Sequence, residues 1–202
     1  MTNDIFEKDN NQRFAFDIQR TIILSKYMNE WGQPEFRKIL RTPNKSAIEI
    51  YYFPSTDIHR FSTVGLSNII RKNGDVIDSE WMLAIYEKNI DIDRIFSYIS
   101  DLIAHFIENC TGNLTPRVLG ESKLAPDHWT AKGILIDELR GESEELEEIE
   151  IGGRKIHVNW IAPLSEAEVQ FILVHGIEEF DKRVDHSDQS IVDPTRISNL
   201  ID

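Results

Sequence analysis

The chain has 202 residues, of which 41% are hydrophobic and 28% charged, as is ordinary for a folded protein with a substantial core. Its 35 acidic and 22 basic residues give a formal net charge of -13, which repels phosphate backbones and anionic membranes and attracts basic proteins. Nucleic acid and membranes are therefore disfavoured as ligands. The single cysteine, Cys110, excludes an intrachain disulfide, and with no secretory signal or membrane span in the sequence it favours a cytoplasmic location.

The first predicted helix follows a polar segment at residues 1–13. Apolar residues recur at helical spacing over residues 14–31, and Gly32 and Pro34 end the run. Short runs rich in β-branched and aromatic residues come next, separated by turn-forming residues. They predict a meander of mainly antiparallel strands at residues 36–40, 47–53, 61–67 and 80–87.

A second helix is predicted at residues 93–109, where a broad apolar side is suited to cover one face of the sheet. The glycines and prolines of residues 110–130 indicate a long crossing loop. Residues 133–139 then predict a strand that leads into an acidic run.

The clearest local signal is a β-hairpin, because two alternating runs meet at Gly152-Gly153 and glycine adopts the positive φ that such a turn needs. This turn sets the register. One face of the hairpin is expected to be apolar and part of the core, and the other is expected to be polar and exposed to solvent. The predicted pairs are Ile151 with Arg154, Glu150 with Lys155, Ile149 with Ile156 and Glu148 with His157.

The last helix is predicted to begin after Ser165, which forms a capping box with Glu168, and to run to residue 184. Gly176 and Leu173 fall on its apolar stripe, so we expect Gly176 to allow a close approach of helix to sheet. His175 is expected on the flank beside Glu168 and Glu179. Residues 185–202 are predicted to form a polar, extended tail.

No reaction centre is visible in the sequence. The six histidines are scattered singly, Cys110 and His105 do not share a helix face, and the Gly65-Leu66-Ser67 stretch lacks the second glycine of a serine-hydrolase elbow. We therefore expect no catalytic residue, no metal site and no cofactor.

The strongest deviation in composition is the acidic run at residues 137–150, with eight acidic residues and one arginine. It fits either a solvated loop or a docking surface for a basic protein, where charge complementarity raises the association rate. The candidate partner-binding glutamates are Glu142, Glu144, Glu145, Glu147, Glu148 and Glu150.

Three segments in order resemble the suppressor of fused (SUFU) domain family: EIYYFPSTDIHRFSTVGLS, then EWMLAIYEK followed by the second helix, then GRKIHVNWIAPLSEAEVQFILVHGIEEF. The likeness covers residues 14–184 and is most specific in the last segment. The residues that carry the family motif, and that we interpret as structural, are Thr63, Gly65, Ser67, Pro163, Leu164, Glu168, His175 and Gly176.

The resemblance implies an α+β fold, an α/β sandwich with a twisted, mainly antiparallel mixed sheet flanked by helices, and a non-enzymatic role in binding proteins. Animal members restrain Gli transcription factors in Hedgehog signalling, partly by letting a partner peptide join as a β-strand. The resemblance further implies that this chain is a short, single-domain bacterial member, and many such members are immunity proteins of polymorphic toxin systems. Since the second domain of the animal proteins is missing from this sequence, Gli binding is not carried over.

Three hypotheses follow. The first is an immunity-type protein that neutralises a cognate toxin, which would be basic if it is a nuclease. The second is a metal-dependent hydrolase built from His59, His157 and His175. The third is a regulatory scaffold that binds an endogenous peptide at a sheet edge. The oligomeric state stays open.

Overall fold

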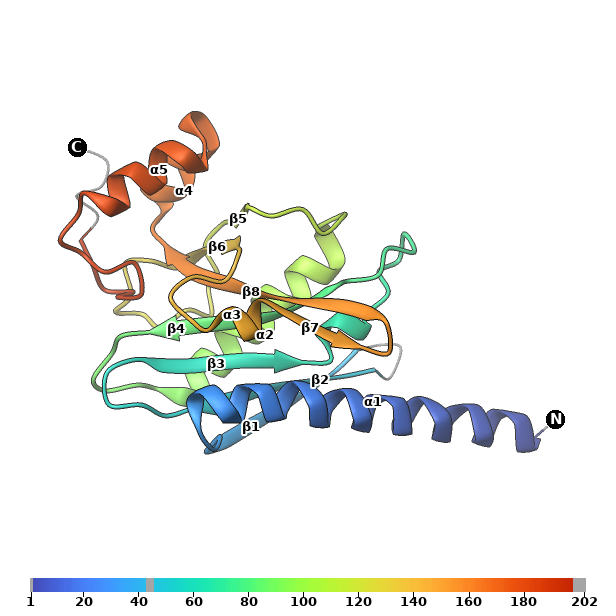
Figure 1. Ribbon diagram of the computed structural model, residues 1–202. Helices are drawn as coiled ribbons and strands as arrows, with labels where there is room; N and C mark the ends of the chain where they lie inside the picture. The colour runs from blue at the N-terminus through green and yellow to red at the C-terminus, as the bar shows by residue number, and fades with distance from the viewer. Residues whose placement is uncertain (1, 43–45, 198–202) are drawn as a thin grey trace.

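The fold is one eight-stranded sheet with helices on both faces, as Figure 1 shows for a computed structural model that describes residues 2–42 and 46–197. The spatial order is β1-β2-β3-β4-β8-β6-β5, and β7 pairs with β8 as an addition to this path. All pairs are antiparallel except β4 with β8. This confirms the predicted α+β class with its mainly antiparallel mixed sheet.

The strands lie close to the positions that alternation predicted. Their bounds are β1 (Phe36–Arg41), β2 (Ala47–Phe53), β3 (His59–Val64), β4 (Ser79–Ile85), β5 (Arg117–Leu119), β6 (Gly133–Asp137), β7 (Glu148–Ile151) and β8 (Arg154–Leu164). The predicted loop at residues 110–130 contains β5, which the sequence did not reveal because only three of its residues pair.

The helices depart further from the predictions. They are α1 (Thr2–Trp31), α2 (Ile92–Asn109), the short α3 (Glu144–Glu147), α4 (Glu166–His175) and α5 (Ile177–Asp185), with a 3-10 turn at Leu66–Asn68. Helix α1 begins at Thr2 and so includes most of the segment predicted only as polar. The single last helix that the sequence predicts is two helices, because the chain breaks at Gly176. Among the helices of the described residues, none is long and apolar enough to cross a membrane.

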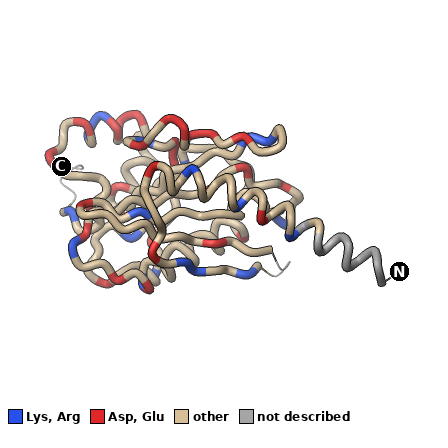
Figure 2. The backbone as a smooth tube through the Cα atoms, turned by 60° about the horizontal axis from the view of Figure 1, so that its bottom comes forward, with Lys and Arg blue, Asp and Glu red and all other residues tan. Residues whose placement is uncertain are grey.

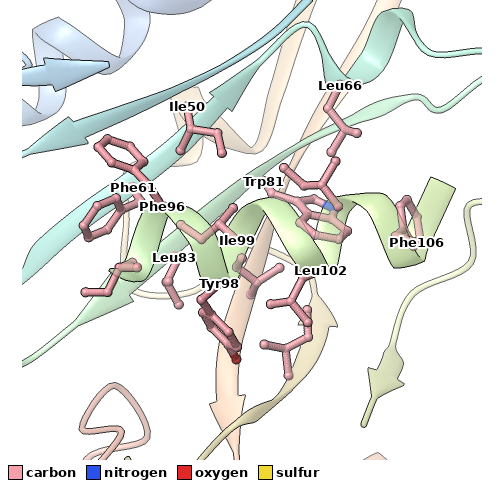
Figure 3. Close-up of a cluster of buried hydrophobic side chains, with 14 of the residues drawn as sticks. Ile50, Phe61, Leu66, Trp81, Leu83, Phe96, Tyr98, Ile99, Leu102 and Phe106 are labelled. Atoms are coloured by element: carbon pink, nitrogen blue, oxygen red, sulfur yellow. The ribbon is translucent and has the colours of Figure 1, made fainter. Parts of the chain in front are cut away.

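Two hydrophobic cores lie on the two faces of the sheet. On one face, α2 packs its apolar side onto β2, β3 and β4, with Trp81 and Tyr98 fully buried (Figure 3). On the other face, Ile23 and Tyr27 of α1 join residues of β2, β8, α4 and α5. Central strand β4 is therefore covered on both faces, which explains its nearly unbroken apolar sequence.

The β7–β8 hairpin has the predicted register in all four pairs. Gly152 and Gly153 adopt φ values of 58° and 79°, as a two-residue turn of this type requires. Ile149 and Ile156 are buried, whereas the side facing water carries Glu148, Glu150 and His157. Local turn chemistry and alternation were sufficient here because the paired residues are close in sequence.

Candidate functional site

The Thr63-x-Gly65-x-Ser67 motif forms a cradle around the carboxylate of Glu80, which is fully buried in β4. One oxygen, Oε1, accepts hydrogen bonds from the backbone N of Gly65 (2.9 Å) and from the N (3.1 Å) and Oγ (2.7 Å) of Ser67. The other, Oε2, accepts from Thr63 Oγ1 (2.6 Å) and Leu66 N (3.1 Å). Five donors thus meet one carboxylate.

The cradle is built for a charged oxygen pair. Thr63 Oγ1 accepts from Trp81 N (2.8 Å) and Ser67 Oγ accepts from Gln19 Nε2 (2.8 Å), which leaves both hydroxyl protons for Glu80. Burial raises the pKa of Glu80, and the hydrogen bonds from Thr63, Ser67 and Gly65 oppose that rise. The motif is therefore a structural clamp that ties β3 to β4 and, through Gln19, to α1.

Two features require glycine at position 65 of this clamp: its backbone conformation and the lack of space for a side chain. Its φ is 100°, and a Cβ here would lie 2.6 Å from the carbonyl oxygen of Ala47 and 2.7 Å from Cε2 of Phe16. Sequence analysis interpreted the motif as structural but missed Glu80, whose only sequence signal is a charged residue next to the apolar run of β4.

A second buried clamp joins Glu168 to Arg196. The predicted capping box of α4 is present: Glu168 N donates to Ser165 Oγ (3.3 Å) and Ser165 N donates to the Glu168 carboxylate (2.7 Å). The same carboxylate accepts from Arg196 Nε (3.1 Å) and Nη2 (2.7 Å), and both side chains are at most 2% exposed. Arg196 Nη2 also donates to the carbonyl oxygen of Pro163 (2.7 Å).

The segment after α5 is consequently bound to the domain as far as Arg196. Tyr86 N donates to Val192 O (2.9 Å), and the N atoms of Thr130 and Ala131 both donate to Pro194 O (3.0 Å each). The prediction of an extended tail is wrong for this part of the chain. Residues 198–202 of that prediction lie outside the described residues.

The predictions for Gly176 and Leu173 are wrong. Gly176 ends α4 with φ 85° and ψ 167°, is exposed, and has no atom within 4 Å of the position that a Cβ would take. Leu173 is 64% exposed, so it does not face the sheet. Gly176 serves backbone conformation rather than close packing, since this φ/ψ region is open almost only to glycine.

His175, which was predicted on the flank beside Glu168 and Glu179, has an aromatic neighbour in the structure. Its exposed ring lies 4.5 Å from the ring of Phe171 between centroids, tilted by 32°, and the guanidinium of Arg183 lies 4.5 Å from the centroid of the Phe171 ring. Glu168 is committed to Arg196, and Glu179 pairs with Lys182 (3.2 Å). The neighbour that the structure gives His175 is therefore an aromatic ring, and the two glutamates form ion pairs with Arg196 and Lys182.

Half of the candidate glutamates of the acidic run bind within the chain. Glu142 accepts from Arg60 Nε (2.7 Å) and Trp31 Nε1 (2.8 Å), which ties its loop to β3 and α1. Glu145 pairs with Lys26 of α1 (3.1 Å), and Glu148 pairs with Lys155 across the hairpin (2.8 Å). The exposed remainder consists of Glu144, Glu147 and Glu150.

The three histidines of the hydrolase hypothesis have separate surroundings. The Nδ1 atom of His59 hydrogen-bonds with Tyr52 Oη (2.8 Å), exposed His157 lies opposite Glu148 in the hairpin, and the ring of His175 contacts that of Phe171. Among the side chains that the structure describes, no group of three from His, Cys, Asp and Glu could hold a metal ion. The geometry therefore gives no support to a histidine-bound metal.

The sheet has an open edge at β1, a feature that sequence analysis did not locate. Of the described strands, only β2 pairs with β1, so the other side of β1 is free. Phe36 is 49% and Ile39 43% exposed. A groove of about 830 Å³ runs beside this edge; it is lined by Phe36, Arg37 and Lys38 of β1 and by Asn89, Ile90, Asp91, Ile92, Asp93 and Phe96 at the start of α2.

The described part of the chain thus forms a mixed, mainly antiparallel sheet with helices on both faces, two internal carboxylate clamps and an open edge at β1. The family model of the Suppressor of fused protein (SUFU) matches residues 44–197, so the chain belongs to the SUFU family. No curated protein matches the chain.

Solved structures share the fold at low sequence identity. A SUFU homologue from Neisseria gonorrhoeae is 12% identical with a TM-score of 0.67, and the alignment covers 89% of this chain and 96% of that one. A chain of the Sufu–Fu complex is 10% identical with a TM-score of 0.64, covering 90% and 91%. Drosophila Suppressor of Fused, at 10% identity and a TM-score of 0.57, is aligned over 76% of this chain but only 42% of its own.

Proposed function

We propose that this chain is a non-enzymatic protein-binding domain of the immunity type, which binds a cognate toxin protein and neutralises it by covering it. Membership of the SUFU family supports protein binding, and the relative solved as a Sufu–Fu complex is a protein complex. The chain would act in the cytoplasm, where the toxin is made.

The observation that carries the proposal is the exposed acidic surface of α3 and β7, formed by Glu144, Glu147 and Glu150 in a chain of net charge -13. Figure 2 shows the acidic residues spread over much of the backbone. A basic partner would be steered toward such a surface, which raises the association rate and makes it sensitive to salt.

The test is co-expression with the product of the adjacent gene. If the proposal holds, the chain rescues cells from that product, and the purified proteins associate more slowly as salt is added. Replacing Glu144 and Glu147 together by Gln is expected to slow association, whereas the double change Glu108→Gln and Glu178→Gln, which removes two exposed charges on α2 and α5, is the matched control. Failure to rescue and to bind would reject the immunity role.

The second candidate is a regulatory scaffold that binds an endogenous peptide at a sheet edge. The specific observation in its favour is the free side of β1 together with the groove beside it. Because strand addition needs an unpaired edge, this function and the immunity function use different surfaces and can be tested separately.

A further inference from the structure

We infer that the open edge of β1 and its groove bind an extended segment of a partner protein in which apolar and acidic residues alternate. The inference rests on the proposed protein-binding function but concerns a different surface from the acidic one. Three properties of the edge support it: its free backbone groups, the shape and chemistry of one side, and the charge of the other.

The free backbone groups of β1 belong to alternate residues. Thr42 N donates to Ser46 O (3.0 Å) in line with the β1–β2 register, so Phe36, Lys38 and Leu40 bond inward to β2. The N–H and C=O groups of Arg37, Ile39 and Arg41 then point away from the sheet. The opposite edge, β5, has only three residues and offers a shorter template.

One side of the edge opens onto the groove. Phe36 stacks on Tyr52, and Lys38 Nζ donates to Ser97 Oγ (3.4 Å), which places both side chains on the α2 face of the sheet. An added strand would direct every second side chain to the same face, into a groove whose walls hold the apolar Ile90, Ile92 and Phe96 together with Asn89, Asp91 and Asp93. Apolar side chains suit these positions.

The other side of the edge is basic. Arg37 reaches the α1 face, where it pairs with buried Glu49 (3.4 Å), and Ile39 and Arg41 share this side by alternation. Strand β1 has three basic residues and no acidic one, although the chain as a whole is strongly acidic. Acidic side chains of an added strand would face Arg37 and Arg41.

The same charges disfavour a second copy of the chain as the occupant. In an antiparallel pair of two β1 strands centred on Ile39, Arg37 of one copy would lie opposite Arg41 of the other, and like charges directly opposite are destabilising. Basic residues on an edge are a known protection against such self-pairing. A separate acidic segment avoids this repulsion.

The experiment uses the full chain and synthetic peptides with blocked ends. The first peptide alternates Asp and Val over eight residues, the second has the same composition in two blocks, and the third replaces Asp by Lys. Binding is followed by fluorescence anisotropy, and amide hydrogen exchange locates it. We expect the alternating acidic peptide to bind at least about tenfold more tightly than the other two and to protect the amides of Arg37, Ile39 and Arg41.

Two variants and one control test the site. Ile39→Pro removes an outward N–H without removing a bond to β2 and is expected to weaken binding at least about tenfold. Arg41→Glu is expected to weaken binding about three- to tenfold. Lys72→Glu, the same charge change on an exposed loop, is expected to leave it unchanged. If Ile39→Pro does not fold, the affinity of Arg41→Glu and the hydrogen-exchange data still show whether the peptide binds at the β1 edge.

The inference is overturned if the block or lysine peptide binds as well as the alternating one, if protection falls on β5 or elsewhere, or if Arg41→Glu behaves like Lys72→Glu. Its failure differs from that of the immunity proposal. If the chain rescues cells from the adjacent gene product but does not bind the peptide, only the inference about the β1 edge is rejected. If it binds the peptide but does not rescue the cells, only the immunity role is rejected.

Discussion

Replacing Glu80 by Gln tests whether the Thr-x-Gly-x-Ser motif is a carboxylate clamp. The substitution keeps the shape of the side chain but replaces one acceptor oxygen by an NH2 group. Since Oε1 meets three donors and Oε2 meets two, the amide nitrogen faces at least two donors in either orientation. The amide nitrogen is therefore expected in the place of Oε2, where it faces only the two donors Thr63 Oγ1 and Leu66 N.

The cost follows from the groups left without an acceptor. In that orientation the hydroxyl of Thr63 can turn, but the backbone N–H of Leu66 cannot, and an unsatisfied buried donor costs about 1–3 kcal/mol. The remaining three bonds lose their charge assistance. We therefore expect Glu80→Gln to lower the free energy of unfolding by about 3 kcal/mol, which corresponds to a fall in Tm of about 6–12 °C for a protein of this size.

Urea unfolding followed by tryptophan fluorescence measures this change, with Glu150→Gln as a control because Glu150 is exposed. The control should stay within about 0.5 kcal/mol of the parent. A loss below about 1 kcal/mol for Glu80→Gln, with an unchanged denaturant slope, would refute the clamp. It would mean that the five donors accommodate a neutral side chain as readily as a carboxylate.

Arg196→Ala should destabilise the fold by about 3–5 kcal/mol because it leaves the Glu168 carboxylate buried without its cation, and a double variant with Glu168→Gln should recover part of that loss in chemical unfolding. Gly65→Ala should prevent folding or lower the free energy of unfolding by more than about 2 kcal/mol, because its Cβ would lie 2.6 Å from a backbone oxygen of β2. A thermal unfolding curve would show this as a fall in Tm. Gly176→Ala and Gly176→Leu should cost a similar amount, about 1–3 kcal/mol, because the strain is in the backbone and the surrounding space is empty. A much larger effect of Leu than of Ala would restore the close-packing account.

Residue patterns were sufficient wherever the interacting partners lie close in sequence. The hairpin register around Gly152 and Gly153 and the capping box of Ser165 and Glu168 were both predicted, because a turn or a cap is specified by a few adjacent residues. The strands of the meander were predicted for the same reason. The family motif further identified the α+β class.

The same periodicity failed at the end of the chain. Over residues 165–184 the apolar spacing continues smoothly, so it placed Gly176 and Leu173 on a buried stripe. The positive φ of Gly176 turns the chain into a new helix, and a helical wheel cannot represent such a break. A glycine in mid-helix is equally compatible with close packing and with a change of direction.

The sequence by itself determined the order of most elements, the hairpin and the cap of α4, because each depends on local conformational preference, and its resemblance to the SUFU family indicated the class of the fold. Only the tertiary structure decided which charges meet: Glu80 with the motif of β3, Arg196 with Glu168, and Glu142 with Arg60 and Trp31. Those partners are separated by 13 to 111 residues, and a long-range contact has no periodicity in the sequence. The open edge of β1 was likewise decided by the strand order of the sheet, which follows from packing of the whole chain.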